Sequence, residues 1–172
     1  MDRGNLVYPS TPPAYPLYDW TTIHDESGWQ INNVHDPAIV KDGEWYYVFS
    51  TDRKVGADEK HPIKAGLQVR RSRDLIHWEW VGYALPGVPE EARRWTGAEI
   101  LWAPDVARFG NTYYLYYVAS RFGTDHSFIG VATGPSILGP WVDRGEVLKT
   151  ASDAHPNASG DTPNAIDPNV AF

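Results

Sequence analysis

Three aspartates recur at nearly even intervals along the chain, and carboxylates are the groups that catalyse cleavage of glycosidic bonds. Asp36, Asp105 and Asp167 each lie at the start of a short apolar run. Inverting hydrolysis needs one carboxylate to activate water and one acid to protonate the leaving oxygen, held about 6.5–9.5 Å apart. A third carboxylate raises the pKa of the acid, because neighbouring like charges resist joint ionisation. Asp before Pro also starts ordinary turns, so a purely structural role remains the alternative.

The sequence around these aspartates predicts two sets of four antiparallel strands. Each set contains a hairpin turn signal followed by an aromatic strand, and Tyr46-Tyr47 and Tyr113-Tyr114 take the same place in the two sets. Four-stranded units repeated on this scale are the blades of a β-propeller, whose innermost strands line a central channel. The aspartates would therefore meet at one mouth of that channel. The predicted strands are 36–40, 44–50, 67–72 and 77–81, then 105–109, 112–118, 128–133 and 140–143.

The expected fold is all-β, with about two and a half propeller blades in the chain. Residues 1–33 contain repeated prolines and are predicted to form an irregular N-terminal arm. Residues 34–172 would form the partial propeller domain. Its parts would be a first blade at 34–82, a second blade at 100–148 and the inner strand of a third blade at 166–172.

The composition narrows the classes of partner. The chain has 172 residues, with 15 Lys and Arg against 22 Asp and Glu, so its net charge of −7 argues against nucleic-acid and membrane binding. It has no Cys, which excludes disulfides and thiolate metal sites. Its 8 Trp and 10 Tyr suit stacking on sugar rings, and filling of a β core is the alternative for each of them. The first residues lack the apolar core of a signal peptide, so we expect an extracellular location if a signal has been removed and a cytoplasmic one otherwise.

Three motifs resemble glycoside hydrolase family 43, with the closest likeness to endo-1,5-α-L-arabinanases. They are Val34-His35-Asp36-Pro37-Ala38-Ile39, Leu101-Trp102-Ala103-Pro104-Asp105-Val106 and Asn164-Ala165-Ile166-Asp167-Pro168-Asn169. The resemblance implies a five-bladed propeller that hydrolyses arabinan, or a related polysaccharide containing arabinose or xylose, with inversion. Two alternatives stay open: an exo-acting β-xylosidase or α-L-arabinofuranosidase, and a carbohydrate-binding propeller fragment without turnover.

The resemblance also implies residue roles. Asp36 matches the general base, and Asp167 matches the carboxylate that tunes and orients the acid. The matched substrate-binding residues are His35, Trp102, Asp105 and Asn164, with Asp105 expected to open the second inner strand. The spacing of the six His residues predicts no metal site of its own, and the resemblance leaves a channel-bound calcium as the one cofactor to consider.

The chain is shorter than the family pattern. Five blades at this spacing would need about 325 residues, and the general-acid Glu of the next blade has no matching position. Glu99 is therefore the candidate surrogate acid, with Glu146 as a second candidate. Open blade flanks and unpaired strand edges favour association, so we expect homo-oligomers that complete the propeller. Catalysis by the isolated chain stays an open question at this point.

Overall fold

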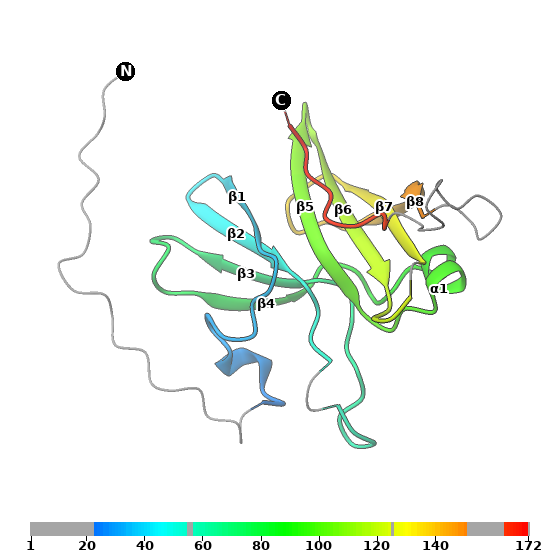
Figure 1. Ribbon diagram of the computed structural model, residues 1–172. Coiled ribbons are helices and arrows are strands. Elements are labelled where there is room, and N and C mark those ends of the chain that lie inside the picture. Colours follow the sequence, from blue (N-terminus) through cyan, green and yellow to red (C-terminus); the bar gives the residue numbers. More distant parts are fainter. Residues whose placement is uncertain (1–22, 55–56, 125, 151–163, 172) are drawn as a thin grey trace.

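Two four-stranded antiparallel sheets form the molecule, as a computed structural model shows (Figure 1). The structure describes residues 23–54, 57–124, 126–150 and 164–171. The strands follow one another in order within each sheet, β1-β2-β3-β4 and then β5-β6-β7-β8, as in consecutive propeller blades. The strands are β1 (Ala38–Asp42), β2 (Trp45–Ser50), β3 (Gln68–Ser72), β4 (Glu79–Tyr83), β5 (Leu101–Phe109), β6 (Thr112–Ser120), β7 (Ser127–Gly134) and β8 (Val142–Lys149).

The predicted repeat is confirmed in the first hairpin of each sheet. Two residues join β1 to β2 and two join β5 to β6, and each loop begins with a glycine at positive φ, 58° at Gly43 and 59° at Gly110. Only glycine adopts this conformation without strain, and such turns match the twist of paired strands. The hairpins place Tyr46 opposite Lys41 and Tyr113 opposite Arg108. The two tyrosine pairs therefore hold equivalent positions.

The hydrophobic core lies between the two sheets. Alternate residues of β2 and β6 are buried in it, and Phe49 and Tyr117 are fully buried. Tyr117 packs so closely over β7 that a Cβ at Gly130 would lie 2.2 Å from the tyrosine ring. Burial of the apolar surfaces between the two facing sheets is the main source of stability for stacked blades. The core fixes the relative positions of the strand ends that carry the candidate site.

A short helix, α1 (Glu90–Thr96), precedes the second sheet and was not predicted from the sequence. Its first turn is acidic, its last turn is basic, and Gly97 ends it in the left-handed conformation, with φ of 66°. The helix packs on β6, β7 and β8. β5 begins at Leu101, so the prediction that Asp105 opens this strand is wrong. Asp105 lies inside β5, next to an irregularity in its pairing with β6.

The described parts of the two end segments pack against the sheets. Residues 23–33 include a 3₁₀ turn, η2 (Glu26–Gly28), which contacts β4, and the fully buried Trp29, whose Nε1 donates to the carbonyl of Ile23 at 3.2 Å. Residues 164–171 have no strand assignment and run along β5 (Figure 1). Residues 1–22 of the predicted 1–33 arm lie outside the described residues. No helix in the described ranges is long and apolar enough to cross a membrane.

Candidate functional site

A cavity of about 360 Å³ lies where the N-terminal end of β5 approaches the C-terminal end of β2. Four of the residues singled out from the sequence line it, which are His35, Asp36, Trp102 and Asp167. They come from three motifs that are far apart in the chain. The remaining lining residues are Asn33, Thr51, Asp52, Arg53, Lys54, Ile100, Ala103 and Phe122.

Asp36 and Asp167 share an unusual backbone conformation. Their φ angles are 48° and 55°, in the left-handed region, and both precede a proline. A non-glycine residue in this region is strained, and such strain is concentrated at functional sites. Both residues are exposed at the cavity. Asp105, the third member of the sequence repeat, does not share this conformation.

A hydrogen bond holds the Asp36 carboxylate in place. The Thr51 hydroxyl donates to Oδ2 of Asp36 at 2.7 Å. The backbone N–H of Thr51 donates to the carbonyl of His35 at 3.0 Å, so the end of β2 and the Asp36 turn are joined twice. Asp36 is exposed and lines the cavity. An exposed carboxylate with one oxygen fixed is suited to accept a proton from water.

Replacing Thr51 by Val removes the hydroxyl and keeps the shape of the side chain. We expect any turnover that depends on Asp36 to fall about tenfold, because one hydrogen bond of about 1.4 kcal/mol no longer positions its carboxylate. Steady-state kinetics would measure this. Thr133→Val is the matched control, since Thr133 lies in β7 outside the cavity and accepts a hydrogen bond from Arg144. Equal effects of both variants would contradict a positioning role for Thr51.

Two aromatic rings line the same cavity. The rings of Trp102 and Phe122 lie 4.8 Å apart between centroids with a tilt of 37°. Trp102 packs against a small apolar cluster that includes Val118 and Ile129, whereas Phe122 is 90% exposed. A supported indole beside an exposed phenyl ring offers an apolar platform. Such a surface can accept the apolar face of a sugar ring.

Asp52 is buried beside the cavity and ties its walls together. Its carboxylate accepts the backbone N–H groups of Gly66, Leu67 and Leu101 at 2.8–2.9 Å, and its own N–H donates to the carbonyl of Leu101. Burial outweighs these bonds and raises its pKa to about 7. The residue is only 3% exposed and both oxygens are engaged, so it is not placed to protonate a substrate. Its bond to Leu101 instead fixes the strand end that carries Trp102.

Asp105 and Asn164 do not line this cavity, and their assignment as substrate-binding residues stays a prediction. Oδ2 of Asp105 accepts the N–H of Val170 at 2.7 Å. The side-chain oxygen of Asn164 accepts the hydroxyl of Ser127 at 3.2 Å. These contacts hold the chain three residues before and three residues after Asp167. We interpret Asp105 and Asn164 as residues that position the Asp167 turn.

Neither candidate surrogate acid has the environment of a proton donor. Glu99 forms an ion pair with Lys54, and the hydrogen bond from this lysine lowers the pKa of Glu99. A general acid needs the opposite shift. Glu146 lies on β8, outside the cavity, where its Oε2 accepts a hydrogen bond from Nζ of Lys149 at 2.7 Å. We therefore do not retain either residue as the acid.

Sequence reasoning missed several residues of the cavity, above all Thr51, Asp52 and Phe122. Thr51 and Asp52 follow the end of the second predicted strand, where polar residues after a buried run are a general signal for a site. Phe122 lies in a loop after β6 and carries no motif. Within the described ranges, the one group of three His, Asp or Glu side chains close enough to share a metal ion lies outside this cavity. The calcium expectation thus gains no support here.

Comparisons with known proteins show the family of the chain. The model of the glycosyl hydrolases family 43 matches residues 31–172. An extracellular endo-α-(1→5)-L-arabinanase of Thermotoga petrophila is 34% identical over 160 residues, which are 81% of this chain and 31% of that protein. The native arabinanase Arb43A of Bacillus subtilis superimposes with a TM-score of 0.60 at 30% identity, over 69% of this chain and 39% of that chain.

A third similar protein was solved with a sugar bound. The α-L-arabinanase of Cellvibrio cellulosa in complex with arabinohexaose matches with a TM-score of 0.58 at 31% identity, over 69% of this chain and 36% of that chain. The present chain spans less than half the length of each of these three proteins. Because the family model covers most of the sequence and the sheets superimpose on those of arabinanases, the chain belongs to the glycosyl hydrolases family 43.

Proposed function

We propose that this chain supplies the general-base side of an active site that hydrolyses α-1,5-linked arabinan with inversion. The observation that carries the proposal is the single cavity lined by His35, Asp36, Trp102 and Asp167. The arabinanase relatives support the choice of substrate, and the extracellular location named for the Thermotoga protein supports an extracellular role. Family 43 membership supports a glycosidase.

We assign the base and the sugar-binding residues of the reaction to this chain, and the acid to further blades. Asp36 removes a proton from water as the water oxygen bonds to the anomeric carbon and the glycosidic bond breaks. Trp102 and Phe122 hold the sugar ring, and Asp167 orients the acid that protonates the leaving oxygen. Burial raises the pKa of Asp52, but both of its carboxylate oxygens already accept backbone N–H groups. We therefore assign the proton donor to further blades.

We propose that a second copy of the chain packs blade to blade against this one. The outer face of the first sheet has an apolar cavity of about 210 Å³, lined by Val34, Pro37, Val48 and Trp78 among others. Ile39 pairs with Val48 on this face and is 57% exposed. On the second sheet, Leu148 pairs with Ile129 and is 56% exposed. Apolar faces of this kind are normally covered in stacked blades.

Sedimentation velocity tests the assembly. We expect a dimer or larger species at micromolar concentration. We expect Ile39→Lys to shift the association equilibrium toward monomer, because the lysine charge would then be buried at the contact between the two copies. Glu44→Lys, in the exposed β1–β2 loop, is the control for the added charge. A folded monomer that hydrolyses arabinan would contradict the assembly proposal.

Release of reducing ends from debranched arabinan tests the activity, with product sizes read by chromatography. A range of oligosaccharides supports endo action. Release of single sugars, or cleavage of nitrophenyl arabinoside or xyloside, would instead favour the exo-acting alternative. Binding of arabino-oligosaccharides without any release would favour a carbohydrate-binding fragment.

Phe122→Ala tests the aromatic platform without disturbing the core. Because Phe122 is 90% exposed, its removal costs little packing, and we expect about tenfold weaker binding of arabinohexaose, or about 1.4 kcal/mol. Isothermal titration calorimetry would measure the dissociation constant. Phe109→Ala is the control, since Phe109 is also an exposed phenylalanine and lies at the far end of β5. Unchanged affinity in Phe122→Ala would exclude the ring from the sugar site.

A further inference from the structure

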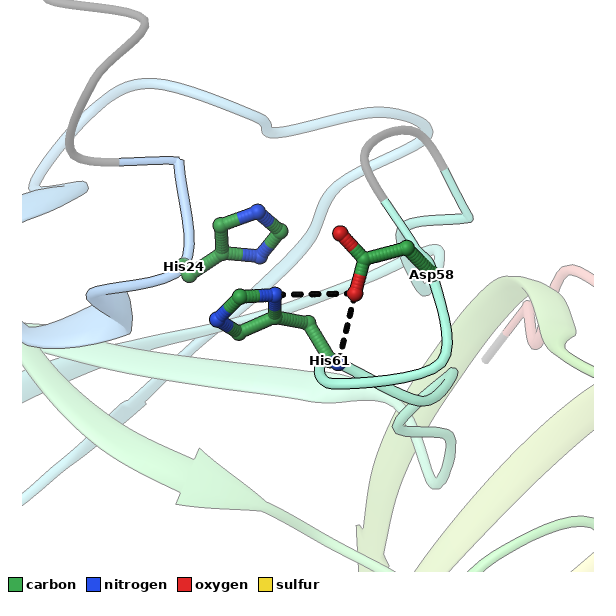
Figure 2. Close-up of side chains that lie close together, drawn as sticks. All are labelled: His24, Asp58 and His61. Atoms are coloured by element: carbon green, nitrogen blue, oxygen red, sulfur yellow. Dashed lines mark hydrogen bonds and ion pairs between the residues drawn. The ribbon is translucent and has the colours of Figure 1, made fainter.

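A second cluster of polar side chains lies between the segment before η2 and the loop after β2. It consists of His24, Asp58 and His61, drawn in Figure 2. One potential ligand atom from each residue lies within 4.8 Å of the other two. The two imidazole rings are stacked, with centroids 3.6 Å apart and planes at 13°. None of the three residues lines the cavity that holds Asp36.

The Asp58 carboxylate is held in a way that leaves one oxygen for a ligand. Oδ1 accepts the backbone N–H groups of Lys60 and His61 at 2.9 and 2.8 Å, and contacts Nδ1 of His61 at 3.0 Å. All three contacts use the same oxygen. Figure 2 shows the other oxygen pointing away from His61 toward the side of His24.

A matched motif elsewhere shows what His24 adds. Asp74 and His77 have the same spacing as Asp58 and His61, and Asp74 likewise accepts the N–H of His77 and contacts its Nδ1, at 2.8 and 2.7 Å. The Asp-x-x-His pair is therefore a loop-capping motif that needs no metal. Only the pair at 58–61 has another imidazole stacked on it among the described residues. That imidazole comes from a segment remote in the chain.

The spacing of the ligand atoms fits a first-row metal ion. Two ligands about 2.1 Å from a tetrahedral Zn²⁺ lie about 3.4 Å apart, and one potential ligand atom from each of His24, Asp58 and His61 lies within 4.8 Å of the other two, so small side-chain rotations would bring them to that spacing. Parallel rings do not aim their lone pairs at one point, so the imidazoles must turn about their side-chain bonds. Imidazole nitrogens favour Zn²⁺ and similar ions over Ca²⁺ and Mg²⁺, which prefer oxygen ligands.

The cationic side chains Arg53, Lys60 and Lys64 line the adjoining cavity together with the Glu26 carboxylate. Lys64, which lines the adjoining cavity, is paired with the Glu26 carboxylate at 2.5 Å. Lys60 is exposed, so water and salt screen its charge. We propose that His24, Asp58 and His61 bind one Zn²⁺-class ion, with water in the fourth position. The ion would join the segment before η2 to the loop that contains Arg53, a residue that lines both this cavity and the one holding Asp36.

Competition with a chromophoric chelator tests the site on the untagged full chain. We expect one Zn²⁺ per chain to be bound, and at least tenfold weaker binding in His24→Ala and His61→Ala. Co²⁺ should give a visible absorption band that His24→Ala abolishes. Both histidines are at least partly exposed, so the variants should fold, and circular dichroism checks this.

His77→Ala is the control, because it removes the same type of residue from the matched Asp-x-x-His pair. We expect it to bind Zn²⁺ as the unmodified chain does. The proposal is overturned if His77→Ala weakens binding as much as His24→Ala, or if the unmodified chain binds no tighter than the double variant His24→Ala/His61→Ala. Neither outcome depends on arabinan hydrolysis, so failure of this proposal is distinguishable from failure of the proposed function.

Discussion

Replacing Asp36 by Asn is expected to lower turnover of debranched arabinan by about 10²–10⁴-fold. Asn keeps the size of the side chain and can still accept the Thr51 hydroxyl, whose present bond to Oδ2 is 2.7 Å long. It cannot take a proton from water. Binding of arabinohexaose should therefore survive while kcat falls, which steady-state kinetics and calorimetry measure separately.

Asp25→Asn is the matched control for this experiment. His24-Asp25 repeats the His35-Asp36 dipeptide, but the Asp25 carboxylate accepts the N–H of Ser27 at 3.1 Å and caps η2. Asp25 does not line the cavity. We expect its variant to retain turnover. Comparable losses in Asp25→Asn and Asp36→Asn would mean that the Asp36 variant acts through folding rather than chemistry.

Replacing Asp52 by Ala is expected to lower the free energy of unfolding by about 3 kcal/mol or more. The change leaves three buried backbone N–H groups without an acceptor, and each such group costs about 1–3 kcal/mol. Those groups belong to Gly66, Leu67 and Leu101. Urea unfolding followed by circular dichroism gives the value. Asp74→Ala is the control, because Asp74 also accepts hydrogen bonds from backbone N–H groups. It lies in an exposed loop, where water can accept those hydrogen bonds in the variant.

The pH dependence of the Asp52 contribution has a defined sign. Burial raises the pKa of Asp52 from 3.8 to about 7, so the folded state takes up a proton relative to the unfolded state between these values. The stabilising contribution is present below about pH 4 and is lost as pH rises through about 7. Asn imitates the neutral acid and does not titrate. Stability of the unmodified chain should thus fall relative to Asp52→Asn from pH 5 to pH 8, and the reverse trend would contradict the shifted pKa.

Local sequence patterns predicted the sheets because strand alternation and hairpin turns depend on neighbouring residues. The Asp42-Gly43 signal and the paired tyrosines located the β1–β2 hairpin and its counterpart in the second sheet. The same rules placed the start of β5 too late, because Pro104 and Asp105 read as a turn. Helix α1 was missed because seven residues show little periodicity, although Gly97 after a basic turn is a recognisable stop signal.

The sequence predicted the cavity residues that belong to a family motif. It missed the residues that only the tertiary fold brings into the cavity. Family likeness identified Asp36, Trp102 and Asp167, and all three line one cavity. It did not separate them from Asp105, which has the same residue type and a similar place in the repeat but binds a backbone N–H from within β5. The role of Phe122 depends on a fold that brings a loop beside Trp102. No local pattern encodes that approach.

A crystal structure of the Asp36→Asn variant with arabinohexaose tests the central claim most directly. The account predicts a furanose ring against Trp102 and Phe122, with Asp167 beside it and a water molecule held by Asn at position 36 on the face opposite the scissile oxygen. An oligosaccharide bound elsewhere, or side chains 36 and 167 on opposite sides of the molecule with no shared cavity, would contradict it.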